Sequence, residues 1–355
     1  MKTFTITKKE VLPESSYLIE GEISLESIEA EKKNALIKFQ DLFAVDGFRK
    51  GHIPEKVLFE KVGDLAIVEE AGSLALEKYY EAIVNEVGIV VIGQPKVSII
   101  KIAPGQPMSF KIETAVVPEV TLPEYKKIAK EEVSSEKEVL VVEDKEVEEA
   151  IKEIRESVAH HKFHQENPDD KSENHNHEFK DEDLPEVTDE FVKTLGKFDS
   201  VEDFKIKLKA NILSEKQLKS REKKRLSIIE KIIKDTKVEV PAVLVESELL
   251  KMMGQFKDNI ASIGLSFEDY LKNISKTEED IRNEWKDEAK KRAIIQLILN
   301  KIAQVEKIEA GEEEVKHQTE ELLTFYKDAD PLRIRIYVET MMVNEKVWKF
   351  LEDQK

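Results

Sequence analysis

Alternating apolar and polar residues predict four β-strands in the first third of the chain. Such a period of two is typical of strands with one buried face. The four segments are Thr3–Thr7, Tyr17–Ser24, Lys96–Ala103 and Met108–Val117. Pro104-Gly105-Gln106-Pro107 separates the last two segments, and its composition predicts a turn that joins them.

Helical spacing fills the interval between the two strand pairs. Apolar residues recur in steps of three and four from Leu25 to Phe43. A second helical stretch runs to about Val87 with a break near Gly63, and Pro54 suits its first turn. Residues 1–112 are therefore predicted to form a small α/β domain.

A different pattern covers residues 113–183. Two prolines make Val116–Tyr125 extended, and an apolar stripe along Asp144–His160 predicts a charged amphipathic helix. Residues 113–160 therefore form an extended linker followed by a helix. Residues 161–183 contain only two large apolar side chains, too few to offset the entropy of ordering, which predicts a flexible tether rich in His and acidic residues.

Helical patterning continues through residues 184–355. A helix that ends near Asp235 after starting at Ser200 would be roughly 50 Å long, which suits an extended arm. Helix N-terminal caps are predicted at Ser200, Ser266 and Thr277, and breaks at Pro241, Gly264, Gly311 and Pro331. The predicted fold class is α+β: a small N-terminal α/β domain followed by an extended, mostly helical C-terminal domain with long arm helices.

Composition narrows the class of protein. The 355 residues include only 12 Gly and 11 Pro, which favours helices, and no Cys, which excludes disulfides and thiolate metal sites. No uncharged run is long enough to span a bilayer, and Met1–Lys9 lacks the apolar core of a secretory signal. We therefore expect a cytoplasmic protein with no membrane partner.

The net charge of −18 argues against general nucleic-acid binding. The net charge is unevenly distributed along the chain. It is −3 for residues 1–112, −15 for residues 113–190 and zero for residues 191–355. The excess acid therefore marks a boundary region rather than a functional site.

The turn after the first predicted helix carries the most informative side chains. It reads Asp46-Gly47-Phe48-Arg49-Lys50-Gly51-His52-Ile53-Pro54. Its glycines and proline break any helix, and an aromatic residue stands beside two cations, which together suit a phosphate or carboxylate next to an apolar anchor. From the residues alone, the alternative is a turn between helices whose Phe48 packs inward and whose charges are solvated.

This turn resembles the ribosome-docking signature of trigger factor, a family of bacterial chaperones. Two further segments are similar to the family in the same order along the chain. Leu184–Phe191 with Leu195-Gly196 resembles the start of its C-terminal helical domain, and Val238–Glu248 resembles the junction after its first arm helix. The resemblance covers the chain from end to end except around residues 160–183.

The resemblance implies a ribosome-docking set made of Gly47, Phe48, Arg49, Lys50, Gly51 and Pro54. This set would meet the large ribosomal subunit beside the tunnel exit, at a ribosomal protein with ribosomal RNA nearby. His52 stands where the family commonly has lysine, which removes one fixed charge. The other implied partners are nascent and unfolded polypeptides and a second copy in a weak homodimer, and no cofactor is implied. The helix at 144–160 is expected to return to the helical body.

The family usually carries an FKBP-like peptidyl-prolyl isomerase domain just before the Leu184 motif. A domain is rarely smaller than about 50 residues, and only His160–Asp183 is available, with no strand pattern and no aromatic set for a proline pocket. We therefore expect the isomerase domain to be absent and name no catalytic residues. An active isomerase of this family and a His-rich metal-binding scaffold are the alternative functions.

Five of the seven histidines lie in or beside the tether: His160, His161, His164, His175 and His177. His160 and His164 have the i, i+4 spacing that can bind Zn²⁺ or Ni²⁺ on a helix. The alternative is a solvated tether in which histidine is a polar filler, because no thiolate is present and nothing orients further ligands.

Methionine side chains adapt to varied apolar partners, so they are candidates for holding client polypeptides. The candidate client-binding residues are Met252, Met253, Phe256, Met341 and Met342. For each of them, core packing is the alternative. The predicted function is an ATP-independent, ribosome-associated chaperone that shields newly made polypeptides from aggregation.

Overall fold

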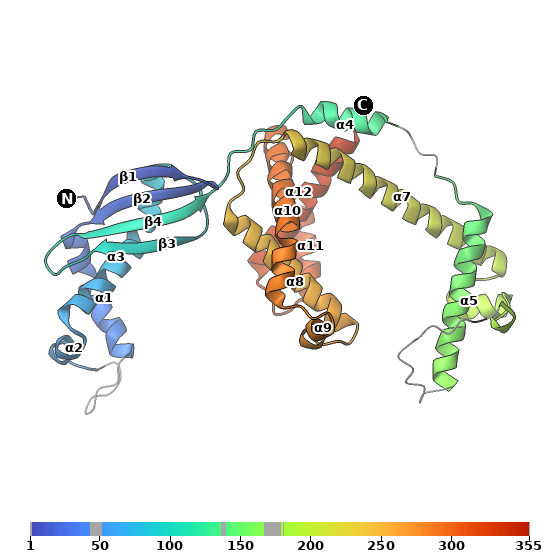
Figure 1. The fold of residues 1–355 in the computed structure, drawn as a ribbon, viewed down its shortest axis with the longest axis horizontal. Helices are drawn as coiled ribbons and strands as arrows, with labels where there is room; N and C mark the ends of the chain where they lie inside the picture. The colour runs from blue at the N-terminus through green and yellow to red at the C-terminus, as the bar shows by residue number, and fades with distance from the viewer. Residues whose placement is uncertain (1, 43–51, 136–139, 167–178, 180, 355) are drawn as a thin grey trace. The chain divides into compact units, whose positions relative to one another are not determined.

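The computed structural model describes residues 2–42, 52–135, 140–166, 179 and 181–354 (Figure 1). An antiparallel sheet with helices forms the N-terminal part, and the remainder is mostly helical, so that helices make up 67% of the chain. The predicted α+β class is confirmed.

Four antiparallel strands form the N-terminal sheet, in the order β1-β2-β4-β3. They are β1 (Phe4–Leu12), β2 (Ser16–Ile23), β3 (Val91–Lys101) and β4 (Met108–Val116). The predicted turn between Lys101 and Met108 joins two neighbouring strands, as expected for a hairpin. All four predicted strands are present, but β3 begins earlier than predicted because Gly93 and Pro95 interrupt the apolar alternation that marks a strand.

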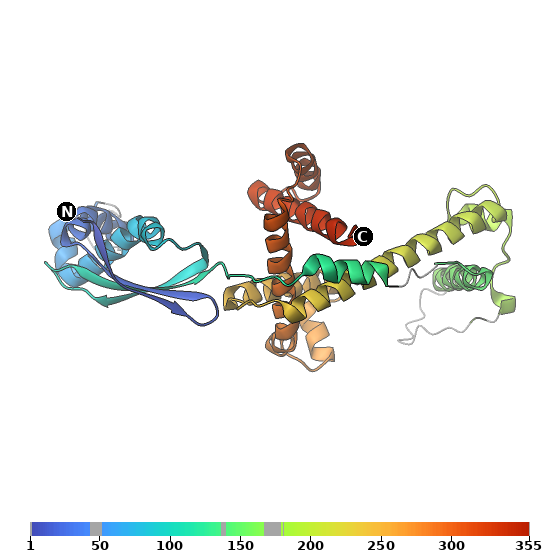
Figure 2. The same ribbon diagram turned by 90° about the horizontal axis from the view of Figure 1, so that it is seen from above.

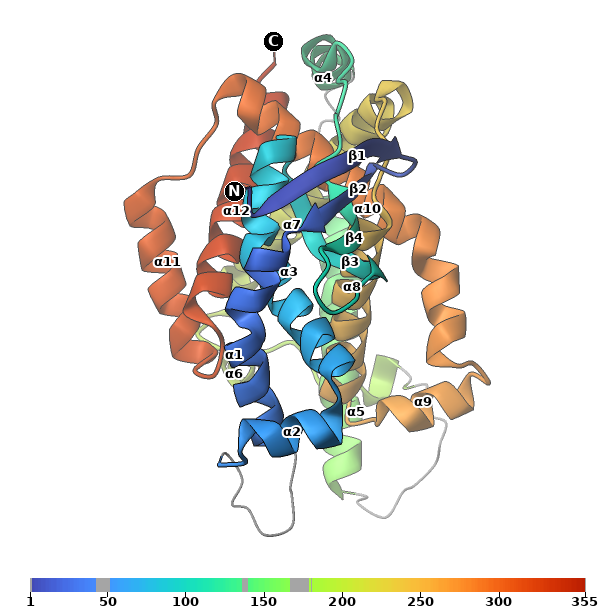
Figure 3. The ribbon, with the colours of Figure 1, turned by 90° about the vertical axis from the view of Figure 1, so that its left-hand side faces the viewer.

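Three helices accompany the sheet: α1 (Leu25–Leu42), α2 (Glu55–Val62) and α3 (Asp64–Val87). They lie on one of its faces (Figure 2). Gly63 separates α2 from α3 at the predicted break, with a φ of 86° that glycine adopts without strain. Figure 3 shows α2 at the C-terminal end of α1 and the N-terminal end of α3.

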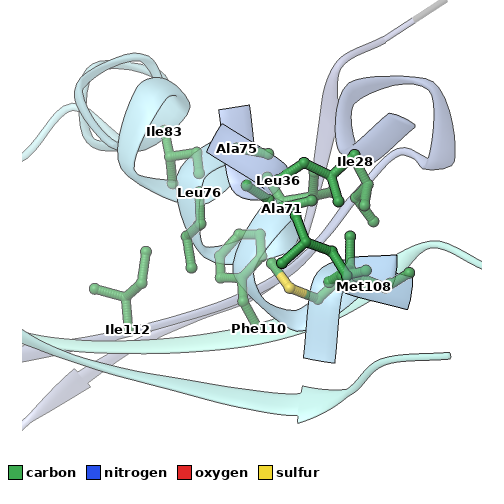
Figure 4. Packing of buried hydrophobic residues seen from close by; sticks show 14 of the residues in the cluster. Ile28, Leu36, Ala71, Ala75, Leu76, Ile83, Met108, Phe110 and Ile112 are labelled. Atoms are coloured by element: carbon green, nitrogen blue, oxygen red, sulfur yellow. The ribbon is translucent and has the colours of Figure 1, made fainter. Parts of the chain in front are cut away.

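The core of this domain lies between the helices and the sheet (Figure 4). Ile28 and Leu36 of α1 are buried, as the helical stripe predicted. They pack with residues of α3 and β4, namely Ala71, Ala75, Leu76, Ile83, Met108, Phe110 and Ile112. Each large side chain buried here contributes about 1.5–3 kcal/mol to folding relative to an exposed position.

The packing divides the chain into two compact units. Unit 1 comprises residues 1–123 and 235–309, and unit 2 comprises residues 124–234 and 310–355. The helical region expected as one domain over residues 184–355 is therefore shared between both units. Long helices pack against partners that are distant in sequence, and sequence order does not reveal those partners.

Unit 1 contains α8 (Ala242–Ser262), α9 (Phe267–Asn273) and α10 (Glu278–Glu306) besides the N-terminal domain. The predicted cap of α10 is a full capping box: Thr277 Oγ1 accepts a hydrogen bond from Asp280 N, and Asp280 Oδ2 accepts one from Thr277 N. Ser266 caps α9 through its hydroxyl in the same way. Both predicted helix starts are confirmed.

Unit 2 contains six α-helices among the described residues. They are α4 (Tyr125–Ser134), α5 (Asp144–Glu166), α6 (Asp189–Leu195), α7 (Val201–Asp235), α11 (Glu312–Phe325) and α12 (Pro331–Glu352). The long α7 ends at the predicted Asp235, whereas α4 lies in a segment predicted to be linker. None of the helices in the described ranges of either unit is long and apolar enough to cross a membrane.

Two differences from the predicted elements of unit 2 have a physical cause. Among its described residues, α4 buries only Tyr125 and Ala129, too few apolar positions to show a stripe against so many charges. The helix α5 continues past the predicted end at His160 to Glu166, so the first residues of the expected tether are helical. Polar residues extend a helix readily once a packed segment has nucleated it.

Candidate functional site

The predicted docking turn connects α1 with α2. Its tip, Gly47–Gly51 with Phe48, Arg49 and Lys50, lies outside the described residues, so these assignments stay predictions. The structure does describe how the chain on both sides of the tip is held.

The C-terminal flank of the turn is anchored in the core of the N-terminal domain, and a hydrogen bond ties it to α1. Ile53 is buried, and its carbonyl oxygen accepts a hydrogen bond from Gln40 Nε2 of α1 at 2.8 Å. Pro54 is the N-cap residue of α2, and its carbonyl oxygen accepts hydrogen bonds from Val57 N and Leu58 N. Pro54 was predicted in the first turn of α2. It lies one residue before that turn, because α2 begins at Glu55.

An ion pair ties together α1 and α3. Glu31 is 6% exposed, and its carboxylate accepts hydrogen bonds from Lys78 Nζ and Asn34 Nδ2, both at 2.6 Å. These bonds hold the pKa of the Glu31 carboxyl below its usual value, so it is ionised at neutral pH. The pair joins the N-terminal half of α1 to the C-terminal half of α3.

Three of the predicted client-binding residues lie in the packed interior of unit 1. Met252 and Met253 of α8 are buried, and Met252 packs with Ala289 and Ala293 of α10. Phe256 is partly buried and meets aromatic rings edge to face. Those rings belong to Phe267, Tyr270 and Trp285, at centroid distances of 6.0, 5.3 and 5.1 Å. For these three positions the structure supports core packing, the alternative stated from sequence.

The other two predicted positions lie on α12. Met342 is partly buried, whereas Met341 is 47% exposed. Three further large apolar side chains of the same half-helix are exposed, namely Leu332, Ile336 and Tyr337. We call these three residues together with Met341 the α12 apolar face.

At about 100° per residue, Leu332, Ile336 and Tyr337 lie on the side of α12 away from the buried Val338, whereas Met341 lies at the edge of this face, about 60° from Val338. The preceding turn adds Phe325, 75% exposed, and Tyr326. Sequence reasoning missed all of these positions except Met341. The sequence does indicate exposed apolar residues here, because Leu332-Arg333-Ile334-Arg335-Ile336-Tyr337 contains more apolar residues than one face of a helix can bury.

Salt bridges attach α12 to α7. Arg225 of α7 donates to the Glu345 carboxylate at 2.7 and 2.8 Å and also to Glu352. Its guanidinium lies 5.6 Å from the centroid of the Trp348 ring. The Arg225 hydrogen bonds lower the pKa of the Glu345 carboxyl. This cluster holds the helix that carries the α12 apolar face.

The tip of unit 2 is a separate hydrophobic cluster. Val147 and Ile151 of α5 pack with Val192 of α6 and Phe204 of α7, and Ile154 lies against them. The apolar stripe predicted for α5 therefore packs against the helical body, as expected. This packing joins chain segments on both sides of residues 167–178.

The candidate metal ligands lie on or beyond the end of α5. His160 and His161 are in α5, whereas the side chain of His164 and both His175 and His177 lie outside the described residues. Where side chains are described, no group of three or more His, Asp or Glu is placed to hold a metal ion. The histidine metal site stays a prediction.

Family profiles match two long stretches of the chain. The profile described as "Bacterial trigger factor protein (TF)" matches residues 4–154, and the one described as "Bacterial trigger factor protein (TF) C-terminus" matches residues 200–352. The chain belongs to the trigger factor family. The match at residues 4–154 includes the predicted docking turn, Asp46–Pro54.

Curated trigger factors align along nearly the whole chain. The trigger factor of Halothermothrix orenii is 27% identical over 94% of this chain and 93% of its own. That of Caldicellulosiruptor bescii is 25% identical over 90% of this chain and 88% of its own. The Clostridium kluyveri alignment covers 98% of both chains but spans 426 residues, more than the 355 present here. The relative therefore contains residues that this chain lacks.

A solved structure of a trigger factor has a similar fold. It is described as "Promiscuous Substrate Recognition in Folding and Assembly Activities of the Trigger Factor Chaperone". The TM-score is 0.52 at 18% identity, with 98% of this chain and 100% of that chain covered. At this level of identity the similarity supports the fold alone.

This trigger factor chain lacks the isomerase domain, since no FKBP-type match lies between residues 154 and 200. At that position, contacts connect α5 with the chain that follows the undescribed residues. Arg155 of α5 donates hydrogen bonds to the carbonyl oxygens of Pro185, at 2.8 Å, and of Asp181 and Leu184. Arg155 therefore adds to the hydrophobic cluster in holding together the segments on both sides of residues 167–178.

Proposed function

We propose that this chain is an ATP-independent chaperone that docks on the large ribosomal subunit and shields nascent polypeptides without prolyl isomerase activity. The observation that carries the proposal is the pair of trigger factor matches on either side of residues 155–199. In this proposal the protein acts in the cytoplasm, where ribosomes and nascent chains are found.

The docking contact is assigned to Phe48, Arg49 and Lys50. Buried Ile53 and the hydrogen bond from Gln40 support it, because both hold the base of the turn rigidly on the domain. A rigid base lowers the entropy cost of presenting an aromatic anchor and two cations. Arginine and lysine suit the phosphates of ribosomal RNA and the carboxylates of a ribosomal protein.

The holding of clients is assigned to the α12 apolar face and the neighbouring Phe325 and Tyr326. Exposed apolar side chains in one half-helix support this assignment, since such surfaces are typical of interaction sites. Many weak apolar contacts would compete with aggregation of an emerging chain while still releasing it. No nucleotide is needed for such a cycle.

Co-sedimentation with ribosomes tests the docking. Replacing Phe48, Arg49 and Lys50 with alanine is expected to abolish binding and to leave the circular dichroism spectrum unchanged. Wild-type binding is expected to weaken with added salt if RNA phosphates are contacted. The matched control replaces Lys8, Lys9 and Val11 on β1 with alanine, and this variant should bind as wild type does. Equal binding by both triple variants would refute the docking assignment.

Suppression of aggregation of a denatured model protein, without ATP, tests the holding. Leu332→Lys combined with Tyr337→Lys is expected to reduce suppression several-fold, because two charges interrupt the α12 apolar face. Both positions are exposed, so the fold should tolerate the change. The control Val11→Lys alters an equally exposed apolar residue on β1. Unchanged suppression by the α12 variant would place the client site elsewhere.

A further inference from the structure

The strand β3 forms one edge of the N-terminal sheet. It pairs with β4 on one side, and no strand among the described residues pairs with its other side. An edge strand presents free backbone N–H and C=O groups that another extended chain can pair with. Regular pairing with β4 runs from Lys96 to Ile99, with register irregularities at both ends.

A groove runs along this edge between β3 and α3. Pro95, Val97 and Ile99 form its floor, because alternate residues of a strand face the same side. Leu76 and Tyr80 of α3 line its wall, and the hollow has a volume of about 630 Å³. Among the strands, α3 contacts β1 and β2 more than β3, so Val97 remains 46% exposed.

The groove continues along β3 beyond Ile99. A second hollow of about 730 Å³ shares Ser73 and Ile99 with the first and extends to Ile102 and Phe39. The two hollows together follow the strand direction, so they match the shape of an extended peptide rather than that of a compact small molecule.

Tyr80 lines this groove, and its hydroxyl has no partner among the described residues. The hydroxyl of Tyr80 is buried and makes no hydrogen bond with any of the described residues. A phenol hydroxyl can both donate and accept, and burying it unpaired is unfavourable. A ligand backbone in the groove would supply the missing partner.

The helical wall of the groove is acidic. Glu69 and Glu77 of α3 line the hollows, and no ion pair is recorded for either within the described ranges. Glu70, which also lines the second hollow, already pairs with Lys38. The two remaining carboxylates favour a ligand that carries positive charge.

We propose that this groove binds a short extended polypeptide segment, with alternating apolar side chains and at least one basic side chain, as a fifth strand beside β3. Strand addition supplies main-chain hydrogen bonds, and the apolar floor selects alternate side chains. Pro95 has no N–H and the pairing of β3 is irregular at both ends, so the ladder is short and binding is reversible. The residues that line the groove belong neither to the docking turn nor to the α12 apolar face.

The first test is fluorescence anisotropy with the full chain and a labelled heptapeptide in which valine alternates with lysine and threonine. Val97→Lys is expected to weaken binding at least tenfold, because it places a charge on the groove floor. The matched control is Val11→Lys on β1, the opposite edge of the same sheet, which should bind as wild type does. Equal affinity of these two variants, or no binding by wild type, would overturn the proposal.

Two further variants examine the groove wall. Tyr80→Phe keeps the ring and removes the unpaired hydroxyl, so peptide affinity should fall about threefold while the thermal midpoint stays equal or rises. Glu77→Lys should weaken binding more at low salt than at high salt, as expected for an exposed charge contact. Wild-type affinity in both variants would overturn the proposed contact of the peptide with α3.

The second test separates strand addition from simple hydrophobic contact. A peptide N-methylated at alternate residues keeps its side chains but loses the hydrogen-bond donors of one edge, so it should bind at least tenfold more weakly. The unmethylated peptide should also slow amide hydrogen exchange in Lys96–Lys101 but not in β1. Protection confined to α12, or equal binding of the methylated peptide, would show that the groove is not the site.

Discussion

Removing the guanidinium of Arg225 should loosen α12 from α7 and thereby disturb the helix that carries the α12 apolar face. The Arg225 side chain is 15% exposed, and its partners Glu352 and Glu345 are 24% and 56% exposed. The Glu352 pair is therefore largely desolvated, and losing one partner leaves an uncompensated carboxylate. We expect Arg225→Ala to lower the free energy of unfolding of unit 2 by about 3 kcal/mol, of which about 2 come from the Glu352 pair and the remainder from the more exposed Glu345 pair and the Trp348 ring contact.

The assay uses the position of the two tryptophans. Trp285 lies in unit 1 and Trp348 in unit 2, and the chain has no others. In a Trp285→Phe background, urea unfolding followed by fluorescence reports on unit 2 through Trp348 alone. The slope of the free energy of unfolding against urea concentration should be the same for both proteins, so a shift of the unfolding midpoint measures the change in stability.

Arg221→Ala is the matched control, one helical turn earlier on α7. Arg221 is 49% exposed and lies 3.9 Å from Glu345, so its removal should cost less than about 0.5 kcal/mol. A loss below about 1 kcal/mol for Arg225→Ala, or an equal loss for both variants, would refute the reasoning from burial.

The pH dependence follows from the lowered pKa of the Glu345 carboxyl, which Arg225 stabilises in its ionised form. A carboxyl whose pKa is lower in the folded state contributes stability above its unfolded pKa, near 4.5, and loses it as the pH falls through the folded value. The difference between wild type and Arg225→Ala should therefore be constant near neutral pH and shrink below about pH 4.5. A difference that grew with acidity would contradict the assigned charge states.

Three further outcomes are expected. Gly21→Val should lower the stability of the N-terminal domain by about 1–3 kcal/mol, because a Cβ at Gly21 would lie 2.5 Å from Thr5 O and 2.6 Å from Phe110 Cζ. Thermal unfolding measures the loss, and the control is Gly254→Ala, since Gly254 has open space where its Cβ would lie. Deleting residues 168–178 should leave the thermal midpoint, ribosome co-sedimentation and holding activity nearly unchanged, because loop-closure entropy varies slowly with length and the hydrogen bonds of Arg155 lie outside the deletion. Loss of the fold or of either activity would contradict this expectation. The full chain should not accelerate isomerisation of an X-Pro peptide, as a protease-coupled absorbance assay can measure, and a clear rate enhancement would restore the isomerase alternative.

Much of the fold was predictable because local patterns decide the type of an element. Capping hydroxyls at Ser266 and Thr277 marked the starts of α9 and α10, and Gly63 marked the break between α2 and α3. These signals act within a few residues, so the neighbouring sequence contains all that is needed. Where local signals conflicted with packing, prediction failed: Gly93 and Pro95 hid the start of β3, and the sparse apolar content of α4 hid that helix.

The candidate sites divide in the same way. The docking turn was predicted from the residue types of one short segment. A hydrogen bond from Gln40 of α1 to the Ile53 carbonyl oxygen holds the chain that enters α2. The client-binding residues could not be separated from core residues by sequence, because Met252 and Met341 have the same side chain in helices of similar length. Their difference depends on whether a second helix covers them.

The sequence by itself determined the strands and helices of the N-terminal domain, the family and the absence of a match to an isomerase domain between residues 154 and 200. Only the tertiary structure decided that α10 covers Met252 while Met341 stays exposed, that Arg225 holds α12 on α7, and that β3 is left as an open edge beside an incompletely covered groove. The physical reason is that element type depends on neighbours a few residues away, whereas burial and exposure depend on packing between segments that lie from about twenty to more than a hundred residues apart, which the local pattern does not specify.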